Sequence, residues 1–176
     1  MPGLFNPPIE SIPEADPNVS PEEQRVYQEF IDNAFKLIYD DKAFPAVLRL
    51  LQRGYEEPSD SLANATFVVL ARLEDSAKDA NHRISPEIMF HGGLEILEDL
   101  AGLAQKARIR TYSDAQLEAA IYKTLDLYRR HKANAGELDP AFFEREASAL
   151  AQNEADGLLD HVDPGLKIRF GRWMRR

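Results

Sequence analysis

The sequence predicts an all-α protein in which about six helices form an antiparallel bundle between an extended N-terminal arm and a basic C-terminal tail. Apolar residues recur every three or four positions from residue 21 to residue 152, which is the period of an amphipathic helix. Helix-start signals, in which Ser or Asp precedes Pro or an acidic residue, separate these stretches. We therefore predict an arm at 1–20, one helical domain at 21–152 with a core bundle at 58–133, and an acidic linker with the tail at 153–176.

The composition is typical of a folded domain. The chain has 176 residues, of which 44% are hydrophobic and 29% charged, so it is long enough for one domain with its own core. It has no cysteine, which excludes disulfides, thiol catalysis and cysteine-ligated zinc. The apolar runs are short and the first residues lack the pattern of a signal peptide, so we expect no membrane span and synthesis in the cytosol.

The arm at 1–20 is rich in proline and is predicted to be extended. Its prolines exclude a helix, and they are Pro2, Pro7, Pro8, Pro13 and Pro17. A disordered terminus is one interpretation, and an arm ordered by docking on its own bundle, a neighbouring subunit or another protein is the other. We predict that the apolar side chains of the arm contact such a partner, and these are Leu4, Phe5, Ile9 and Ile12.

A helical hairpin follows the arm. The segment SPEE at 20–23 predicts a helix that begins at Pro21 and runs to about Tyr39. Its predicted buried face is Val26, Phe30, Ala34, Leu37 and Ile38. A shorter helix with Pro45 in its first turn comes next, and Gly54 is the predicted residue just after its end. Its predicted apolar residues are Val47, Leu48, Leu50 and Leu51.

Three longer helices are predicted to form the core bundle. The first runs from Pro58 to about Asn81, the second begins after Ser85, and the third begins with a capping box at 113–116. The predicted stripe of the first is Leu62, Thr66, Val69, Leu73, Ala77 and Ala80. That of the second is Phe90, Gly93, Leu97, Leu100 and Ala104. That of the third is Leu117, Ile121, Leu125 and Tyr128, with Ala120 and Thr124.

Two adjacent glycines, Gly92 and Gly93, fall inside the second of these helices. A glycine inside a helix costs about 1 kcal/mol relative to alanine. We therefore predict that both are helix-packing residues, at a place where the backbone of another helix approaches closely.

The end of the chain changes character. Asp139-Pro140 predicts a last helix to about Gln152, with an apolar side of Phe142, Phe143, Ala147 and Leu150. Residues 166–176 hold five basic residues and no acidic one, so the remainder of this chain, whose total net charge is −9, carries −14. We predict that the basic and aromatic residues of the tail contact a partner, and these are Arg169, Phe170, Arg172, Trp173, Arg175 and Arg176.

Three partners fit this tail. Arginines on phosphates with stacked aromatic rings would suit nucleic acid, and the same residues would suit an anionic membrane surface. Trp and Arg are also the anchors typical of protein–protein interfaces, and we favour a protein partner.

One cluster suggests a metal. Glu87, His91 and Glu95 are four residues apart and share one helix face, with about 6 Å between successive positions, which could suit a divalent ion. A solvated charged face explains the same pattern. No nucleophile elbow, phosphate loop, dinucleotide fingerprint or His-Glu-x-x-His motif is present. We predict no catalytic residue, no metal ligand and no cofactor.

An acidic helical body between a proline-rich arm and an aromatic-basic tail resembles the small α-helical virion proteins of tailed bacteriophages, of the portal or head–tail junction type. The resemblance implies a non-catalytic subunit that binds other copies of itself and other assembly proteins. It implies a virion location, or the cytoplasm if the chain is not of phage origin. Two alternatives stay open: a metal-binding helical-bundle enzyme, and a nucleic-acid-binding accessory protein that uses its tail.

Overall fold

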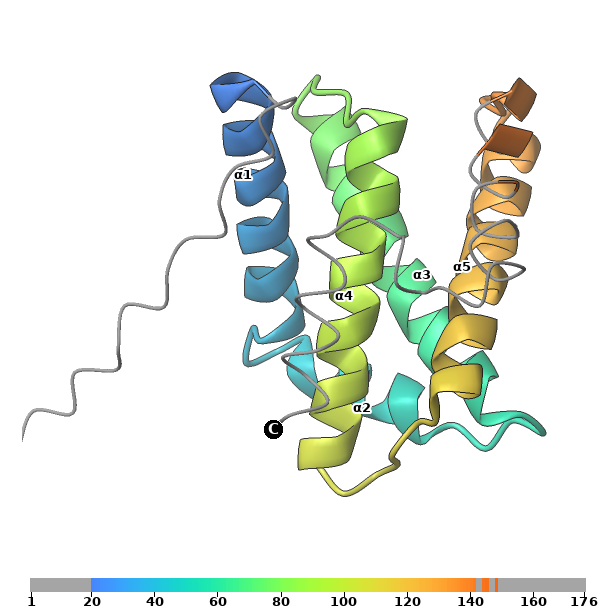
Figure 1. Ribbon diagram of the computed structural model, residues 1–176. Helices are drawn as coiled ribbons and strands as arrows, with labels where there is room; N and C mark the ends of the chain where they lie inside the picture. The colour runs from blue at the N-terminus through green and yellow to red at the C-terminus, as the bar shows by residue number, and fades with distance from the viewer. Residues whose placement is uncertain (1–19, 142–143, 146–147, 149–176) are drawn as a thin grey trace, which may run out of the picture.

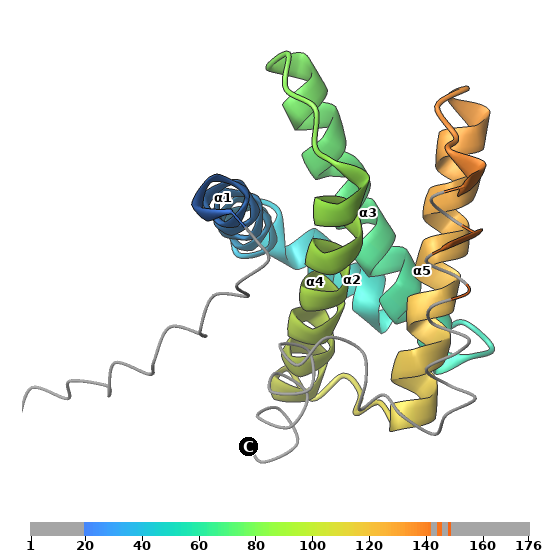
Figure 2. The same ribbon diagram turned by 45° about the horizontal axis from the view of Figure 1, so that its top comes forward.

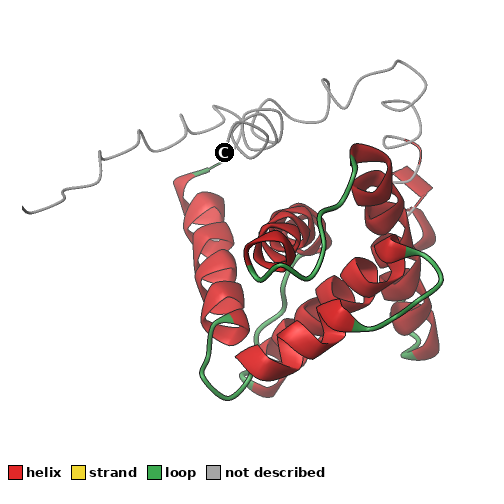
Figure 3. Cartoon of the chain, turned by 90° about the horizontal axis from the view of Figure 1, so that it is seen from below, coloured by secondary structure: helices red, strands yellow, loops and turns green. Residues whose placement is uncertain are grey.

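The computed structural model describes residues 20–141, 144–145 and 148. This part of the chain is all-helical, as predicted, and contains no strand (Figures 1 and 3). Its helices are α1 (Pro21–Ile38), α2 (Phe44–Gln52), α3 (Pro58–Asp79), α4 (Pro86–Lys106) and α5 (Asp114–Asn134). The predicted last helix falls mostly outside the described residues, although positions 140–141, 144–145 and 148 are helical.

Three helices begin at the serine caps that the sequence predicts. At α1 the Ser20 hydroxyl accepts the Glu23 N–H at 3.2 Å, and the Glu23 carboxylate accepts the Ser20 N–H at 2.9 Å. A second capping box joins Ser113 and Gln116 at α5. Ser85 accepts the N–H of Ile88 at 3.2 Å to begin α4. Each cap satisfies backbone donors that have no partner within the helix, so these starts follow from local sequence.

Helices α3, α4 and α5 are each followed by a residue with left-handed backbone geometry. Asn81 and Arg108 each have a φ of 56°, and Gly136 has a φ of 71°. After each of them the chain closes the paired backbone hydrogen bonds of a Schellman motif. Gly54 follows the end of α2 at the expected position, but it lacks a positive φ, so α2 ends without this motif.

Replacing Arg108 with glycine is expected to stabilise the protein by about 0.5–1 kcal/mol, because a left-handed conformation strains any residue with a Cβ. Urea unfolding measures the change. Ala107→Gly is the matched control, since Ala107 has a φ of −76° and gains nothing from glycine. A neutral or destabilising Arg108→Gly variant would contradict the assignment.

Helix α3 lies at the centre of the body (Figures 1 and 2). It packs against α5 on one side and against α4, α1 and α2 on the other, whereas α4 and α5 touch each other little. Helices α1 and α4 run downward in Figure 1 and α3 and α5 run upward. The start of α1 and the end of α5 therefore lie at the same end of the body (Figure 1).

The central position of α3 explains why its predicted stripe is incomplete. Ala63, Ala65 and Leu70 are buried in addition to the predicted residues, because the helix is covered on two sides. Ala77 is only half-buried and Ala80 is exposed, since Ala80 already caps the helix end.

The predicted buried face of α1 is wrong at its first residue. Val26 is 41% exposed, and Tyr27 packs against the core in its place. The stripe therefore runs through Tyr27, Phe30, Ala34 and Ile38, one position later than predicted at its start. No helix within the described residues is long and apolar enough to cross a membrane.

Candidate functional site

The residues predicted to contact partners lie outside the described part of the chain. These are Leu4, Phe5, Ile9 and Ile12 of the arm and Arg169, Phe170, Arg172, Trp173, Arg175 and Arg176 of the tail. Within the described residues, the features that could carry a function are the glycine pair and charged face of α4, a buried ion network, and an apolar pocket.

Gly92 and Gly93 are both buried, and each faces a different helix. A Cβ on Gly92 would lie 2.7 Å from Cδ1 of the Phe30 ring on α1, and closer still to Cε1. A Cβ on Gly93 would lie 3.1 Å from Cδ1 of Leu70 on α3. The close neighbours are therefore side chains, not the helix backbone that we expected. The glycine pair lets a ring and a branched side chain lie against α4.

The charged face of α4 is divided between solvent and α1. Glu87 and His91 are exposed. Glu95, in contrast, accepts a hydrogen bond from the Tyr27 hydroxyl at 2.7 Å. Among the described residues, no group of three or more His, Cys, Asp or Glu side chains lies close enough to hold a metal ion. The helical spacing of Glu87, His91 and Glu95 therefore does not translate into a ligand cluster.

A second tyrosine extends the attachment of α1 to α4. The Tyr39 hydroxyl donates to Asp99 at 2.8 Å. Burial raises the pKa of Asp99 above its usual range, although the hydrogen bond from Tyr39 opposes that change. Partial burial also raises the pKa of Tyr39, and the nearby Asp99 adds to the rise. Both pairs give α4 carboxylates a structural role, because each joins α4 to α1.

A buried ion network joins the last turns of α3 and α5. Glu74 on α3 is only 6% exposed, and its Oε1 accepts hydrogen bonds from the Tyr128 hydroxyl at 3.1 Å and from Lys132 Nζ. Its Oε2 has no hydrogen-bond partner among the described residues. Lys132 also donates to Glu137 at 2.8 Å, and Lys78 donates to the same carboxylate at 3.0 Å. The network therefore ties the chain beyond α5 back to α3.

The network shifts the pKa values of its members in the directions that favour these contacts. Burial lowers the pKa of Lys132, but hydrogen bonds to Glu137 and Glu74 more than offset that effect, and the result lies above the ordinary value. Burial raises the pKa of Tyr128, and the charge of Glu74 adds to the rise. Hydrogen bonds from Lys132 and Lys78 lower the pKa of Glu137 from 4.5 to about 2. Sequence patterns missed Glu74, because an acidic residue on a helix normally indicates a solvated face.

The pKa of Glu137 predicts a pH dependence. A carboxyl group whose folded pKa is depressed stabilises the fold above its unfolded pKa, and this stabilisation is lost as the pH falls through the folded pKa. The contribution of Glu137 should therefore be complete above about pH 5 and disappear towards about pH 2. Glu137→Gln should lower the unfolding midpoint at neutral pH. The difference in midpoint between this variant and the unaltered protein should become smaller as the pH is lowered. A constant difference across this range would contradict the assignment.

A second ion cluster fixes the start of α3 to α5. Lys123 Nζ donates to Glu57 at 2.6 Å, to the Ser59 hydroxyl at 2.9 Å and to Asp60 at 2.5 Å. Its side chain is one-third exposed, so solvent screens this cluster more than the Glu74 network. Together, the two clusters hold α5 along α3 in parallel order, with residue 60 beside residue 123 and residue 74 beside residue 132.

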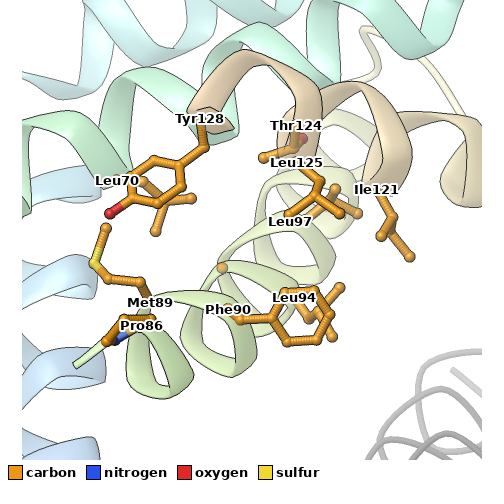
Figure 4. A pocket seen from close by; sticks show the side chains of 11 residues that line it. Leu70, Pro86, Met89, Phe90, Leu94, Leu97, Ile121, Thr124, Leu125 and Tyr128 are labelled. Atoms are coloured by element: carbon orange, nitrogen blue, oxygen red, sulfur yellow. The ribbon is translucent and has the colours of Figure 1, made fainter. Parts of the chain in front are cut away.

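A small apolar pocket lies between α4 and α5, where the two helices separate (Figure 4). Its volume is about 40 Å³, and it is lined by Leu70, Pro86, Met89, Phe90, Gly93, Leu94, Leu97, Ile121, Thr124, Leu125 and Tyr128. The two polar groups in this lining are engaged: the Thr124 hydroxyl donates to the Ala120 carbonyl at 2.7 Å, and the Tyr128 hydroxyl donates to Glu74. The pocket therefore suits an apolar group and offers no arrangement for acid–base chemistry.

The described part of the body thus contains ion pairs and hydrogen bonds that join helices, and an apolar pocket. Comparisons with protein families, with curated proteins and with solved structures found no match to this chain.

Proposed function

We propose that the protein is a non-catalytic subunit of a larger assembly, in which the helical body is a rigid spacer and the flanking segments make the contacts. The observation that best supports this proposal is that the chain enters α1 and leaves α5 at the same end of the body (Figure 1). The arm and the segment that leads to the tail are therefore attached at the same end of the body, one on each flank of it, because α1 and α5 lie on opposite sides of α3 and α4 (Figures 1 and 2). Such an arrangement suits two segments that engage neighbours at one end of the body.

The polar contacts of the body support a role as a spacer. Tyr27 and Tyr39 join α1 to α4, Lys123 joins α5 to the start of α3, and Lys132 joins α5 to Glu74. Glu74 is buried, and a buried polar group that is hydrogen-bonded in this way favours one arrangement of the helices. A body of fixed shape holds its flanking segments at a constant separation.

The resemblance to small virion proteins of tailed bacteriophages extends this proposal. In that interpretation the protein is an antiparallel bundle of about six helices, with 140–152 as the last helix, and it forms part of a portal or head–tail junction. Its partners are then other copies of the chain and other virion proteins, and the basic tail meets protein or packaged nucleic acid.

Substitutions in the flanking segments test the proposal. We expect full-length variants to lose self-association when either segment is altered. The dissociation constant for self-association should rise at least about tenfold, which corresponds to about 1.4 kcal/mol. One variant changes the arm (Leu4, Phe5, Ile9 and Ile12 to Ser), and the other changes the tail (Arg169, Arg172, Arg175 and Arg176 to Glu). Sedimentation velocity over a range of concentrations measures the assembly, and circular dichroism checks the helix content.

Matched controls alter the surface of the body in the same chemical way. Val26 and Val68 are exposed apolar residues for replacement with Ser, and Arg25, Arg72 and Arg83 are exposed basic residues for replacement with Glu. Self-association that both flanking variants retain would overturn the proposal. A tail variant that assembles normally but no longer binds a short DNA duplex would instead favour the nucleic-acid-binding alternative.

A further inference from the structure

The pocket between α4 and α5 is incompletely covered by the helices that line it. Phe90 on α4 and Leu125 on α5 are each only half-buried at this place, although both are large and apolar. The volume of about 40 Å³ is well below the roughly 150 Å³ of a cavity that binds benzene. The pocket is therefore too small for a separate organic ligand and suits part of one apolar side chain.

The chain beyond α5 turns back towards the body. Gly136 has a φ of 71°, and the next residue, Glu137, is held by Lys132 and Lys78. Leu138 then packs against the core. The Asp139 carboxylate accepts the N–H of Ala141 at 3.1 Å, which begins a new helical stretch. The backbone is thus anchored at each step as it leaves α5.

The helical stretch after Asp139 has a defined outer face. Positions 141, 144, 145 and 148 are helical and exposed, and their spacing of three and four residues places them on one side of a helix. Arg145 Nη2 lies 3.8 Å from the Glu87 carboxylate in the first turn of α4. Glu87 is adjacent in sequence to Pro86, which lines the pocket. The stretch therefore lies beside the pocket, where the positive charge of Arg145 complements the negative charge of Glu87.

We propose that the pocket between α4 and α5 is the docking site for the chain's own segment 142–152. The side of this segment away from its exposed positions carries Phe143, Ala147 and Leu150 in the sequence. These three residues have the spacing of one apolar helix stripe. One side chain of the stripe fills the pocket, and the others cover Phe90 and Leu125. This docking does not depend on whether the protein assembles with other copies.

Disulfide trapping tests the docking in the full-length chain, which has no cysteine of its own. Phe143→Cys is combined in turn with Phe90→Cys and with Leu125→Cys, and the matched control is Glu144→Cys with the same partners. A disulfide requires two Cα atoms within about 7 Å, so only the side that faces the pocket should cross-link. We expect at least one Phe143→Cys pair to form an intramolecular disulfide, seen as faster migration in a non-reducing gel, and the Glu144→Cys pairs to form none.

Other outcomes would overturn the proposal. The proposal is contradicted if neither Phe143→Cys pair forms a disulfide, or if the Glu144→Cys pairs form one equally well. Either result would mean that the segment does not turn its apolar side towards the pocket. Disulfide-linked dimers would show that a second copy supplies the segment.

Because cysteine variants can fold poorly, hydrogen exchange of the full-length Phe143→Asp and Glu144→Gln variants gives a second measurement. Phe143→Asp should increase exchange at least about tenfold in α5 and the first turns of α4, and Glu144→Gln should not; unchanged exchange in Phe143→Asp contradicts the docking.

Discussion

Replacing Lys132 with methionine is expected to lower the free energy of unfolding by about 3 kcal/mol. Lys132 is the cation that compensates Glu74, a carboxylate whose side chain is 8% exposed. Methionine has an unbranched side chain that lacks the charged amino group, so it leaves Glu74 with only the Tyr128 hydroxyl as a donor among the described residues. A buried carboxylate without a cation is costly because water can no longer solvate it. Urea unfolding at neutral pH measures the loss.

Arg130→Met is the matched control for this prediction. Arg130 lies on the same helix and pairs with Asp126 at 2.6 Å, but its side chain is 67% exposed. Exposed ion pairs contribute about 0–1 kcal/mol, so the control should change stability little. Equal losses in Lys132→Met and Arg130→Met would show that solvent screens the Glu74 network as well.

The double variant Glu74→Leu with Lys132→Met separates the two contributions of the pair. Replacement of both partners of a buried ion pair by apolar residues of similar size is often neutral or stabilising. We therefore expect the double variant to recover most of the stability lost in Lys132→Met alone. A loss equal to the sum of the single losses would contradict the idea that an uncompensated Glu74 causes the effect.

The helices could be predicted from sequence because their limits depend on local chemistry. A serine hydroxyl satisfies nearby backbone N–H groups wherever the chain lies, so the starts at Ser20, Ser85 and Ser113 do not depend on tertiary contacts. The same argument fails at helix ends. Arg108 adopts a left-handed conformation that sequence alone assigns to glycine or asparagine, because the closing hydrogen bonds outweigh its strain.

The packing could be predicted only in part. A periodic stripe shows that a helix has a buried face, but it does not show that α3 is covered on two sides. For that reason the sequence pattern predicts that Glu74 is exposed, although it is buried beside Tyr128 and Lys132. The candidate pocket also has no sequence signature, since its lining comes from three helices. Such features depend on contacts between residues that are far apart in the chain.

Replacing Gly92 with leucine is expected to destabilise the protein by about 3 kcal/mol through overpacking. Even the first added carbon would lie 2.7 Å or less from the Phe30 ring, which is itself 6% exposed and cannot move freely into solvent. Gly93→Leu should cost less, about 1–2 kcal/mol, because its nearest neighbour is a methyl group of Leu70 at 3.1 Å. Thermal and urea unfolding measure both losses.

A double-mutant cycle shows whether Phe30 causes the effect at Gly92. In a Phe30→Ala background the added leucine occupies the space that the ring has left. Gly92→Leu should therefore lower the free energy of unfolding by at least about 1 kcal/mol less in that background than in the unaltered protein. Gly54→Leu is the control, since a Cβ at Gly54 meets no atom within 4 Å, and its effect should stay within about 0.5 kcal/mol. If the loss from Gly92→Leu is the same with and without the Phe30 ring, the ring is not what requires glycine on this face of α4. Helix propensity cannot then explain the loss either, because leucine favours a helix more than glycine does.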